Sequence, residues 1–362
     1  MKNYSTYATI CRRLTLLGCL TAGSFLGTSN RSAADEPPAV ETPAAETPAE
    51  TPVVVADENA DAKAAEEAKA AAEAKAAAET KAAEEAKAAA DAEAAKMEAE
   101  RLAKEAADAV PLIADPALEA AVRAEVYEKR NNQDKLTVDD VKNISRVVGR
   151  GRGIKSLDGL QHCAALMLID LENNEITDLT PLGGLAKLQS VTLAGNQITD
   201  IAPLKNLTAM QLLDLSRNQV SDLSPLSEMK NLRTLYLAKN RLTSLDPIAG
   251  LSKIWSLDVS ANELTDTDPV AGLAWLTMLD IRQNQIRSLD PIKGLRELDY
   301  LLLNNNPIED LSSLVEMCRI DAEGEKRFAP YLKVYVGENA FTENVNDQLE
   351  ALKKLGVKIE QP

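Results

Sequence analysis

Apolar residues recur with a fixed period of 22 residues over much of this chain, beginning at Ile144. Each unit follows the pattern apolar-x-x-apolar-x-apolar-x-x-Asn-x-apolar, and one unit reads LQSVTLAGNQITDIAPLKNLTA. The alternation of apolar and polar residues at the start of each unit predicts a short strand with one buried face. The pattern holds without a slip in the units that start at Leu166, Leu188, Met210, Leu232, Ile254, Leu276 and Leu298.

Asparagine occupies the ninth position of each of these units, where the strand ends and the chain turns sharply. The turn leaves backbone groups inside the stack that must be paired, and an amide side chain can both donate to and accept from them. We therefore predict a structural ladder of stacked asparagines. Its members are Asn174, Asn196, Asn218, Asn240, Asn262, Asn284 and Asn306.

Proline occupies the sixteenth position of most units, as at Pro181 and Pro203, and its fixed φ suits the first residue of a short helical turn. One unit alone cannot bury its apolar residues, whereas a stack of units can. The predicted fold is therefore an α/β solenoid with short parallel strands on its concave side and short helical turns on its convex side. A period of 22 residues lies within the range of leucine-rich repeats.

The repeated LxxLxLxxNxIxDLxPLxxL motif resembles the repeats of internalin-type bacterial leucine-rich-repeat proteins, over roughly residues 112–320. The segment from Asp115 to Arg123 looks like the helical N-terminal cap of that family, and a second short helix is expected to open at Thr137. The resemblance implies protein–protein recognition as the general role. It does not extend to an immunoglobulin-like domain or an LPxTG signal, so host-cell invasion is not implied.

The two ends of the array depart from the pattern. In the first unit, Arg152 stands where asparagine is expected, and Gly149, Gly151 and Gly153 are expected to interrupt the strand. After Cys318 the period breaks, and a further strand-like unit starts at Tyr331 after an insertion of about eleven residues. A helix near residues 345–355 and a closing segment at 357–359 are expected to seal this end.

The third, fifth and seventh positions of each unit alternate with buried positions, so they are expected to face outward on the concave side. Tyr236, Tyr300 and Leu302 are predicted to be exposed anchors for a partner. Three aspartates make this surface acidic, which predicts a protein partner with a basic and partly apolar surface. The residues predicted to bind the partner are Leu212, Asp214, Tyr236, Asp258, Met278, Asp280, Arg282, Tyr300 and Leu302.

Asp258 and Asp280 fall on neighbouring strands, with carboxylates expected about 5 Å apart. Calcium could relieve their repulsion, but further oxygen ligands at a recognised spacing are lacking. The same residues could instead only keep the sheet soluble.

The first 34 residues are typical of an export signal. Lys2, Arg12 and Arg13 precede an apolar run at residues 14–27, and cleavage after Ala34 is the interpretation that we favour. A lipoprotein box ending at Cys19 and a twin-arginine signal remain alternatives. The predicted location is secreted, periplasmic or at the cell surface, with no membrane span after cleavage, because the run is shorter than the roughly 20 residues that a span needs.

Charge excludes several classes of partner. The formal charge of the chain is −16, and residues 1–34 contain four basic and no acidic residues, so their removal gives −16 − 4 = −20. Such acidity argues against nucleic acid and anionic membranes as partners, because both select clustered Lys and Arg.

Two low-complexity segments lie between the signal and the repeats. Residues 35–58 repeat Glu-Thr-Pro-Ala, which is typical of a disordered linker. Residues 59–110 are rich in Ala, Glu and Lys, which predicts a long helix. Lysine recurs there every six residues, so it spreads around the helix and leaves no apolar seam for a coiled coil. A single helical stalk is therefore favoured, with self-association through 59–110 as the alternative.

The sequence offers little for catalysis. His162 and Cys163 are adjacent, but Cys163 stands where later units have leucine, so it is predicted to belong to the core. Cys163 and Cys318 lie at opposite ends of the array, too far apart for a disulfide. We find no phosphate-binding glycine loop, zinc spacing or nucleophile motif, and we predict neither an enzyme nor a cofactor.

The predicted organisation is a signal peptide (1–34), a linker (35–58), a stalk (59–110), a helical N-terminal cap (111–143), leucine-rich repeats (144–319) and a C-terminal cap (320–362). The predicted function is protein recognition by the concave face. The alternative is a structural component of the cell envelope, in which the stalk spaces the solenoid from a wall or membrane.

Overall fold

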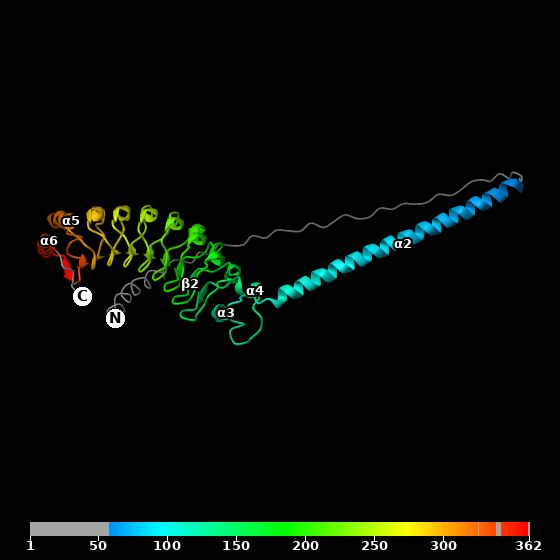
Figure 1. Cartoon of the computed structure of the whole chain (residues 1–362), viewed down its shortest axis with the longest axis horizontal. Helices are drawn as coiled ribbons and strands as arrows, with labels where there is room; N and C mark the ends of the chain where they lie inside the picture. The colour runs from blue at the N-terminus through cyan, green and yellow to red at the C-terminus, as the bar shows by residue number, and fades with distance from the viewer. Residues whose placement is uncertain (1–57, 325, 338–341, 361–362) are drawn as a thin grey trace, which may run out of the picture. The chain divides into compact units, whose positions relative to one another are not determined.

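The computed structural model describes residues 58–324, 326–337 and 342–360 (Figure 1). The predicted signal peptide and all but the last residue of the predicted linker lie outside these residues. In the described residues, no helix is long and apolar enough to cross a membrane.

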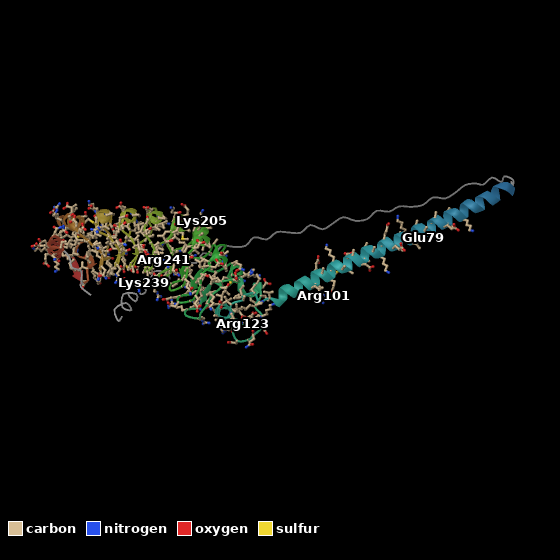
Figure 2. All side chains as sticks on the ribbon, in the orientation of Figure 1. Glu79, Arg101, Arg123, Lys205, Lys239 and Arg241 are labelled. Atoms are coloured by element: carbon tan, nitrogen blue, oxygen red, sulfur yellow. The ribbon has the colours of Figure 1, made fainter. Side chains whose placement is uncertain are left out.

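The Ala/Glu/Lys segment forms one helix, α2 (Glu58–Ala109). Its side chains are exposed over residues 71–102, including the large apolar side chains of Met97 and Leu102. Figure 2 shows Glu79 and Arg101 projecting from this helix, and Arg101 forms an ion pair with Glu98, three residues earlier. Over residues 71–102 the side chains form no buried apolar stripe, which agrees with the six-residue period of the charges.

The repeats form one parallel sheet in which every strand pairs with the next strand along the chain. Residues at equivalent repeat positions are partners, as in Leu213 with Leu235, so the 22-residue period fixes the register. The strands of the repeats are β1 (Arg146–Val148), β2 (Leu168–Asp170), β3 (Ser190–Thr192), β4 (Leu212–Asp214), β5 (Thr234–Tyr236), β6 (Ser256–Asp258), β7 (Met278–Asp280) and β8 (Tyr300–Leu302).

Short 3-10 turns lie on the side of the repeats opposite the sheet (Figure 1). From η2 onward, each turn has its proline at the first or second position, as predicted. The turns are η1 (Leu160–His162), η2 (Thr180–Leu182), η3 (Ala202–Asn206), η4 (Ser224–Leu226), η5 (Asp246–Ile248), η6 (Asp268–Gly272) and η7 (Asp290–Gly294). The predicted leucine-rich-repeat solenoid is confirmed.

The N-terminal cap contains α3 (Pro116–Arg123) and α4 (Val138–Val141). Asp115 caps α3 through the N–H groups of Ala117 and Leu118, and its other carboxylate oxygen accepts from Lys155 and Ser156 in the first repeat. These bonds lower the pKa of Asp115 against the opposing effect of its burial. One side chain therefore both starts the cap helix and fastens it to the solenoid.

The glycines of the first repeat do not break the sheet, contrary to our expectation. The N–H groups of Gly149 and Gly151 donate to the carbonyls of Asp170 and Glu172, both at 2.8 Å. A side chain at Gly149 would meet Ala121 of α3 at 3.1 Å from its Cβ position, so glycine here makes room for the cap.

The C-terminal end contains α5 (Ser312–Glu323), β9 (Lys333–Tyr335), α6 (Glu343–Lys354) and β10 (Lys358–Glu360). Tyr300 pairs with Lys333, which places the expected eleven-residue insertion between β8 and β9. The closing segment extends the sheet as a tenth strand, paired with β9. A domain boundary after residue 319 would divide α5.

One continuous core runs through the solenoid and both caps. Leucine and isoleucine at the fourth and sixth positions of the repeats are fully buried, as are Cys163 and Cys318. Both cysteines are free thiols, and burial raises the pKa of each to about 12.

Candidate binding face

The asparagine ladder holds each strand end in place. Asn240, for example, accepts from the Val220 N–H of the preceding repeat at 2.9 Å through Oδ1. Its Nδ2 donates to the carbonyl of Leu237 in its own repeat at 2.9 Å and to that of Leu215 in the preceding repeat at 3.0 Å. The same pattern recurs along the array, and it explains Arg152: the first repeat has no preceding repeat for an asparagine to reach.

Each backbone carbonyl that lies between two neighbouring asparagines of the ladder accepts a hydrogen bond from both of them. The Leu215 carbonyl accepts from Asn218 at 2.9 Å and from Asn240 at 3.0 Å. The sequence did not reveal this sharing, because it depends on the distance between neighbouring turns.

The residue before the ninth position of each repeat has a left-handed backbone, which we did not predict. Its φ lies between 53° and 71° throughout the series Gly151, Asn173, Gly195, Arg217, Lys239, Ala261, Gln283 and Asn305. Most of these are not glycine, so the ladder holds a conformation that costs of order 1 kcal/mol at each such position. The frequent occurrence of Gly and Asn at this position is the sequence feature that could have predicted the left-handed conformation.

We define the concave face as the third, fifth and seventh positions of the repeats from β2 to β8. The prediction that Tyr236 is an exposed anchor on this face is wrong, because only 9% of its surface is accessible. Leu302 is likewise buried, at 5%. The physical reason is that in-register strands flank each side chain with its equivalents on both sides, and these cover it. The Tyr236 hydroxyl also lies 3.4 Å from the Ser256 hydroxyl, which donates to it.

The predicted residues divide into two groups. Leu212, Met278 and Tyr300 are half-buried and offer apolar surface, while Asp258 and Arg282 are half-buried and charged. The Lys333 ammonium group also lies over the Tyr300 ring, 5.0 Å from its centroid. The second group is buried and belongs to the scaffold of the face: Asp214, Tyr236, Asp280 and Leu302.

The acidic residues of the concave face are largely neutralised within the chain. At its N-terminal end, Arg150 forms ion pairs with Asp170 and Glu172, and Arg217 reaches Glu172 at 3.0 Å. Glu172 is buried, and its two arginine partners come from the preceding repeat and from the second repeat after it. The sequence does not point to Arg150, Glu172 or Arg217, because their ion pairs join positions of different repeats.

Asp258 and Asp280 are partners on neighbouring strands, as predicted. The cation beside Asp280 is Arg282, whose Nε donates to Oδ1 at 2.8 Å and to Oδ2 at 3.0 Å. Asp258 instead accepts from the N–H and the hydroxyl of Ser260, at 2.9 and 2.7 Å. Burial, followed by repulsion from Asp280, raises the pKa of Asp258 to about 7 despite these bonds. No cluster of three or more metal-ligating side chains occurs in the described ranges, so the calcium hypothesis gains no support.

The Cys163 thiol beside His162 is not activated as a nucleophile. Cys163 is buried in the core, at the position that leucine occupies in later repeats, and its raised pKa keeps it as a thiol. A thiol in this state is a poor nucleophile.

Family models of leucine-rich repeats match residues 186–228 and 275–316 as two-copy units, and residues 208–264 as a longer unit. The chain is similar to internalin C2 of Listeria monocytogenes at 33% identity and a TM-score of 0.55, covering 57% of this chain and 91% of that one. It is similar to a second internalin of that organism, inlF, at 27% identity and a TM-score of 0.61, covering 69% of this chain and 76% of the other. Comparison with curated protein sequences gives no significant match.

Proposed function

Because the chain belongs to the internalin family of leucine-rich-repeat proteins, we propose that its concave face binds a protein partner without catalysing a reaction. The observation that carries the proposal is the strand register, which aligns equivalent side chains of successive repeats on one face. Such a row of aligned side chains can contact a folded surface over several repeats at once. The internalin-like fold is typically non-catalytic, and the buried thiols fit that role.

Apolar contacts of the proposed face come from Leu212, Met278 and Tyr300, which share the third position of their repeats. Met278 and Tyr300 are partners on adjacent strands. Side chains that are half-buried by their neighbours are already restricted, so binding them costs less conformational entropy than binding free surface chains.

The polar contact of the proposed face is Asp258, which its raised pKa of about 7 leaves partly ionised at neutral pH. Asp280 is held by Arg282, and the acids near β2 are held by Arg150 and Arg217, whereas Asp258 forms no ion pair with a described residue and accepts its hydrogen bonds from Ser260. A basic side chain of a partner would relieve the repulsion between Asp258 and Asp280. The proposed partner surface is therefore apolar with a basic group beside it.

Capture of a partner by the full chain tests this proposal. The concave variant combines Leu212→Ser with Asp258→Lys, and the matched control changes Lys205, an exposed residue of η3 on the opposite side, to Glu. We expect the concave variant to lose the partner and the control to retain it, with melting temperatures verifying that both fold. Equal capture by both variants would remove the concave face from the proposal.

We further propose that the protein is exported and that α2 spaces the solenoid from its point of attachment or release. The signal-like residues 1–34 and the exposed surface of α2 over residues 71–102 support this. Cell fractionation tests it, with substitution of the Leu14–Leu17 run by charged residues as the variant. Association with the envelope that persists after deletion of residues 111–362 would instead favour the structural role.

A further inference from the structure

A second surface lies on the flank of the solenoid where each strand begins. Both tryptophans of the chain are there, Trp255 as the second residue of its repeat and Trp275 as the last residue before the next. Trp275 is 69% exposed, more than any other large apolar side chain within the repeats. An exposed tryptophan of this size is the side chain most enriched at the centre of binding sites.

Backbone hydrogen bonds place the neighbouring residues of this flank in order. The Trp255 N–H donates to the Arg233 carbonyl at 2.9 Å, and the Thr277 N–H donates to the Trp255 carbonyl at 2.8 Å. The Asp299 N–H donates to the Thr277 carbonyl at 2.8 Å. Arg233, Trp255, Thr277 and Asp299 therefore stand immediately before the four successive strands β5 to β8, one step apart.

Charge changes sign along this row. Lys253 and Arg233 lie on one side of the tryptophans, and Glu297 and Asp299 lie on the other, all four exposed. Proximity to Glu297 contributes, after burial, to the raised pKa of Asp299, which Lys333 only partly offsets. We call Arg233, Lys253, Trp255, Trp275, Glu297 and Asp299 the tryptophan flank.

The charged side chains of the tryptophan flank differ from those of the concave face in forming no ion pair with another described residue. Among the described residues, no ion pair involves Arg233, Glu297 or Asp299, and Lys253 donates only to the amide of Asn231, at 2.8 Å. On the concave face, by contrast, Glu172 and Asp280 already have arginine partners. Unpaired opposite charges around an exposed aromatic group fit a ligand that brings its own charges in complementary order.

We propose that the tryptophan flank binds an extended protein segment with the order acidic-x-apolar-x-basic. Strands are about 4.8 Å apart, so Arg233 and Asp299, three steps apart, are separated by about 14 Å. An extended chain of about 3.3 Å per residue crosses that distance in roughly four residues. Residues i, i+2 and i+4 of such a chain also share one face, so its acidic, apolar and basic side chains would meet Arg233, the tryptophans and Asp299 together.

The sign change favours a protein segment over an acidic polysaccharide. A polymer with a carboxylate on every unit would pair with Arg233 and Lys253 but would be repelled by Glu297 and Asp299. A peptide, unlike such a polysaccharide, can present an acidic and a basic side chain within this distance. This surface lies outside the concave face and does not depend on the function proposed above.

Intrinsic fluorescence of the full chain provides the test, because Trp255 and Trp275 are the only tryptophans. The probe is the blocked peptide Glu-Ser-Leu-Ser-Lys, titrated against matched peptides with Glu or Lys at both ends and with Ser in place of Leu. We expect saturable quenching or a blue shift with the probe, weakened by salt, and about tenfold weaker binding of each matched peptide.

Exposed-residue variants complete the test, with melting temperatures verifying the fold. Changing both Arg233 and Lys253 to Glu should reverse the preference, so that the peptide with Lys at both ends binds more tightly than the probe. Trp275→Ser should weaken binding of the probe, and the fluorescence of Trp255 still measures it. The control Lys187→Glu, at the equivalent position of Lys253 three repeats earlier, should change nothing. Equal responses to all peptides, no saturable response, or tighter binding of an oligogalacturonate than of the probe would overturn the proposal.

Discussion

Neighbouring asparagines of the ladder should be energetically coupled through the carbonyl that they share. Asn218→Ala removes the acceptor of the Ile198 N–H, and Asn240→Ala removes that of the Val220 N–H. In either single variant the Leu215 carbonyl keeps one donor, since the other asparagine remains. In the double variant it loses both.

The magnitude follows from these bonds. Each single change orphans one buried N–H, at about 1–3 kcal/mol, and removes two bonds from carbonyls that stay paired, at about 0.5–1.5 kcal/mol each. We therefore expect each single variant to lower the free energy of unfolding by about 2–6 kcal/mol. The double variant should lose about 1–2 kcal/mol more than the sum, because the Leu215 carbonyl is then orphaned as well.

Urea denaturation followed by circular dichroism measures this coupling as a double-mutant cycle. The control pair, Asn196→Ala with Asn284→Ala, shares no carbonyl, since Asn196 bonds Leu171 and Leu193 while Asn284 bonds Val259 and Ile281. The effects of the control pair should add to within about 0.5 kcal/mol. Equal coupling in the two pairs, or none in the adjacent pair, would refute the shared-carbonyl reasoning.

Three further predictions concern other parts of the chain. The folded-state pKa of Asp258, about 7, exceeds its ordinary value of 3.8, so the folded chain binds more protons than the unfolded chain between these values. The contribution of Asp258 to the stability of the fold is therefore lost as pH rises from about 4 to about 7. The difference in melting temperature between Asp258→Asn and the native chain should grow over that range. A constant difference would contradict this reasoning. Cys163 and Cys318 should resist Ellman's reagent at pH 8 until urea unfolds the chain, because burial raises the pKa of each thiol to about 12. Fast reaction of the folded protein would show instead that the thiols are accessible. Residues 59–110 should sediment as a helical monomer, because the described side chains of α2 form no apolar stripe, and a stable oligomer would support self-association through this helix instead.

The repeat spacing by itself was enough to predict the solenoid. A parallel sheet needs the same apolar positions in every unit, and the 22-residue period imposes its register directly, as in Leu213 with Leu235. The asparagine ladder was predictable for a similar reason, since a buried turn has few ways to pair its backbone groups. The helices of the N-terminal cap were readable from local chemistry, because the Thr137 capping box needs only residues three positions apart, whereas α5 at the C-terminal end was not predicted.

The candidate face was predicted only in part, because exposure depends on what the neighbouring repeats contribute. The sequence placed Tyr236 on the outward side of its strand but gave no measure of how closely β4 and β6 flank it. It also gave no indication that Arg150 and Arg217 approach Glu172 from different repeats, or that Arg282 turns back onto Asp280.

What the sequence determined, then, is what repeats: strand positions, register, turns and the asparagine ladder. Each of these follows from the local pattern of the chain, because the same short-range preference is satisfied again in every unit. The tertiary structure alone decided which outward side chains remain accessible, which charges are neutralised and which tryptophan stands exposed. Those properties arise between units, where a few ångströms of separation set the burial of Tyr236, the pKa of Asp258 and the exposure of Trp275.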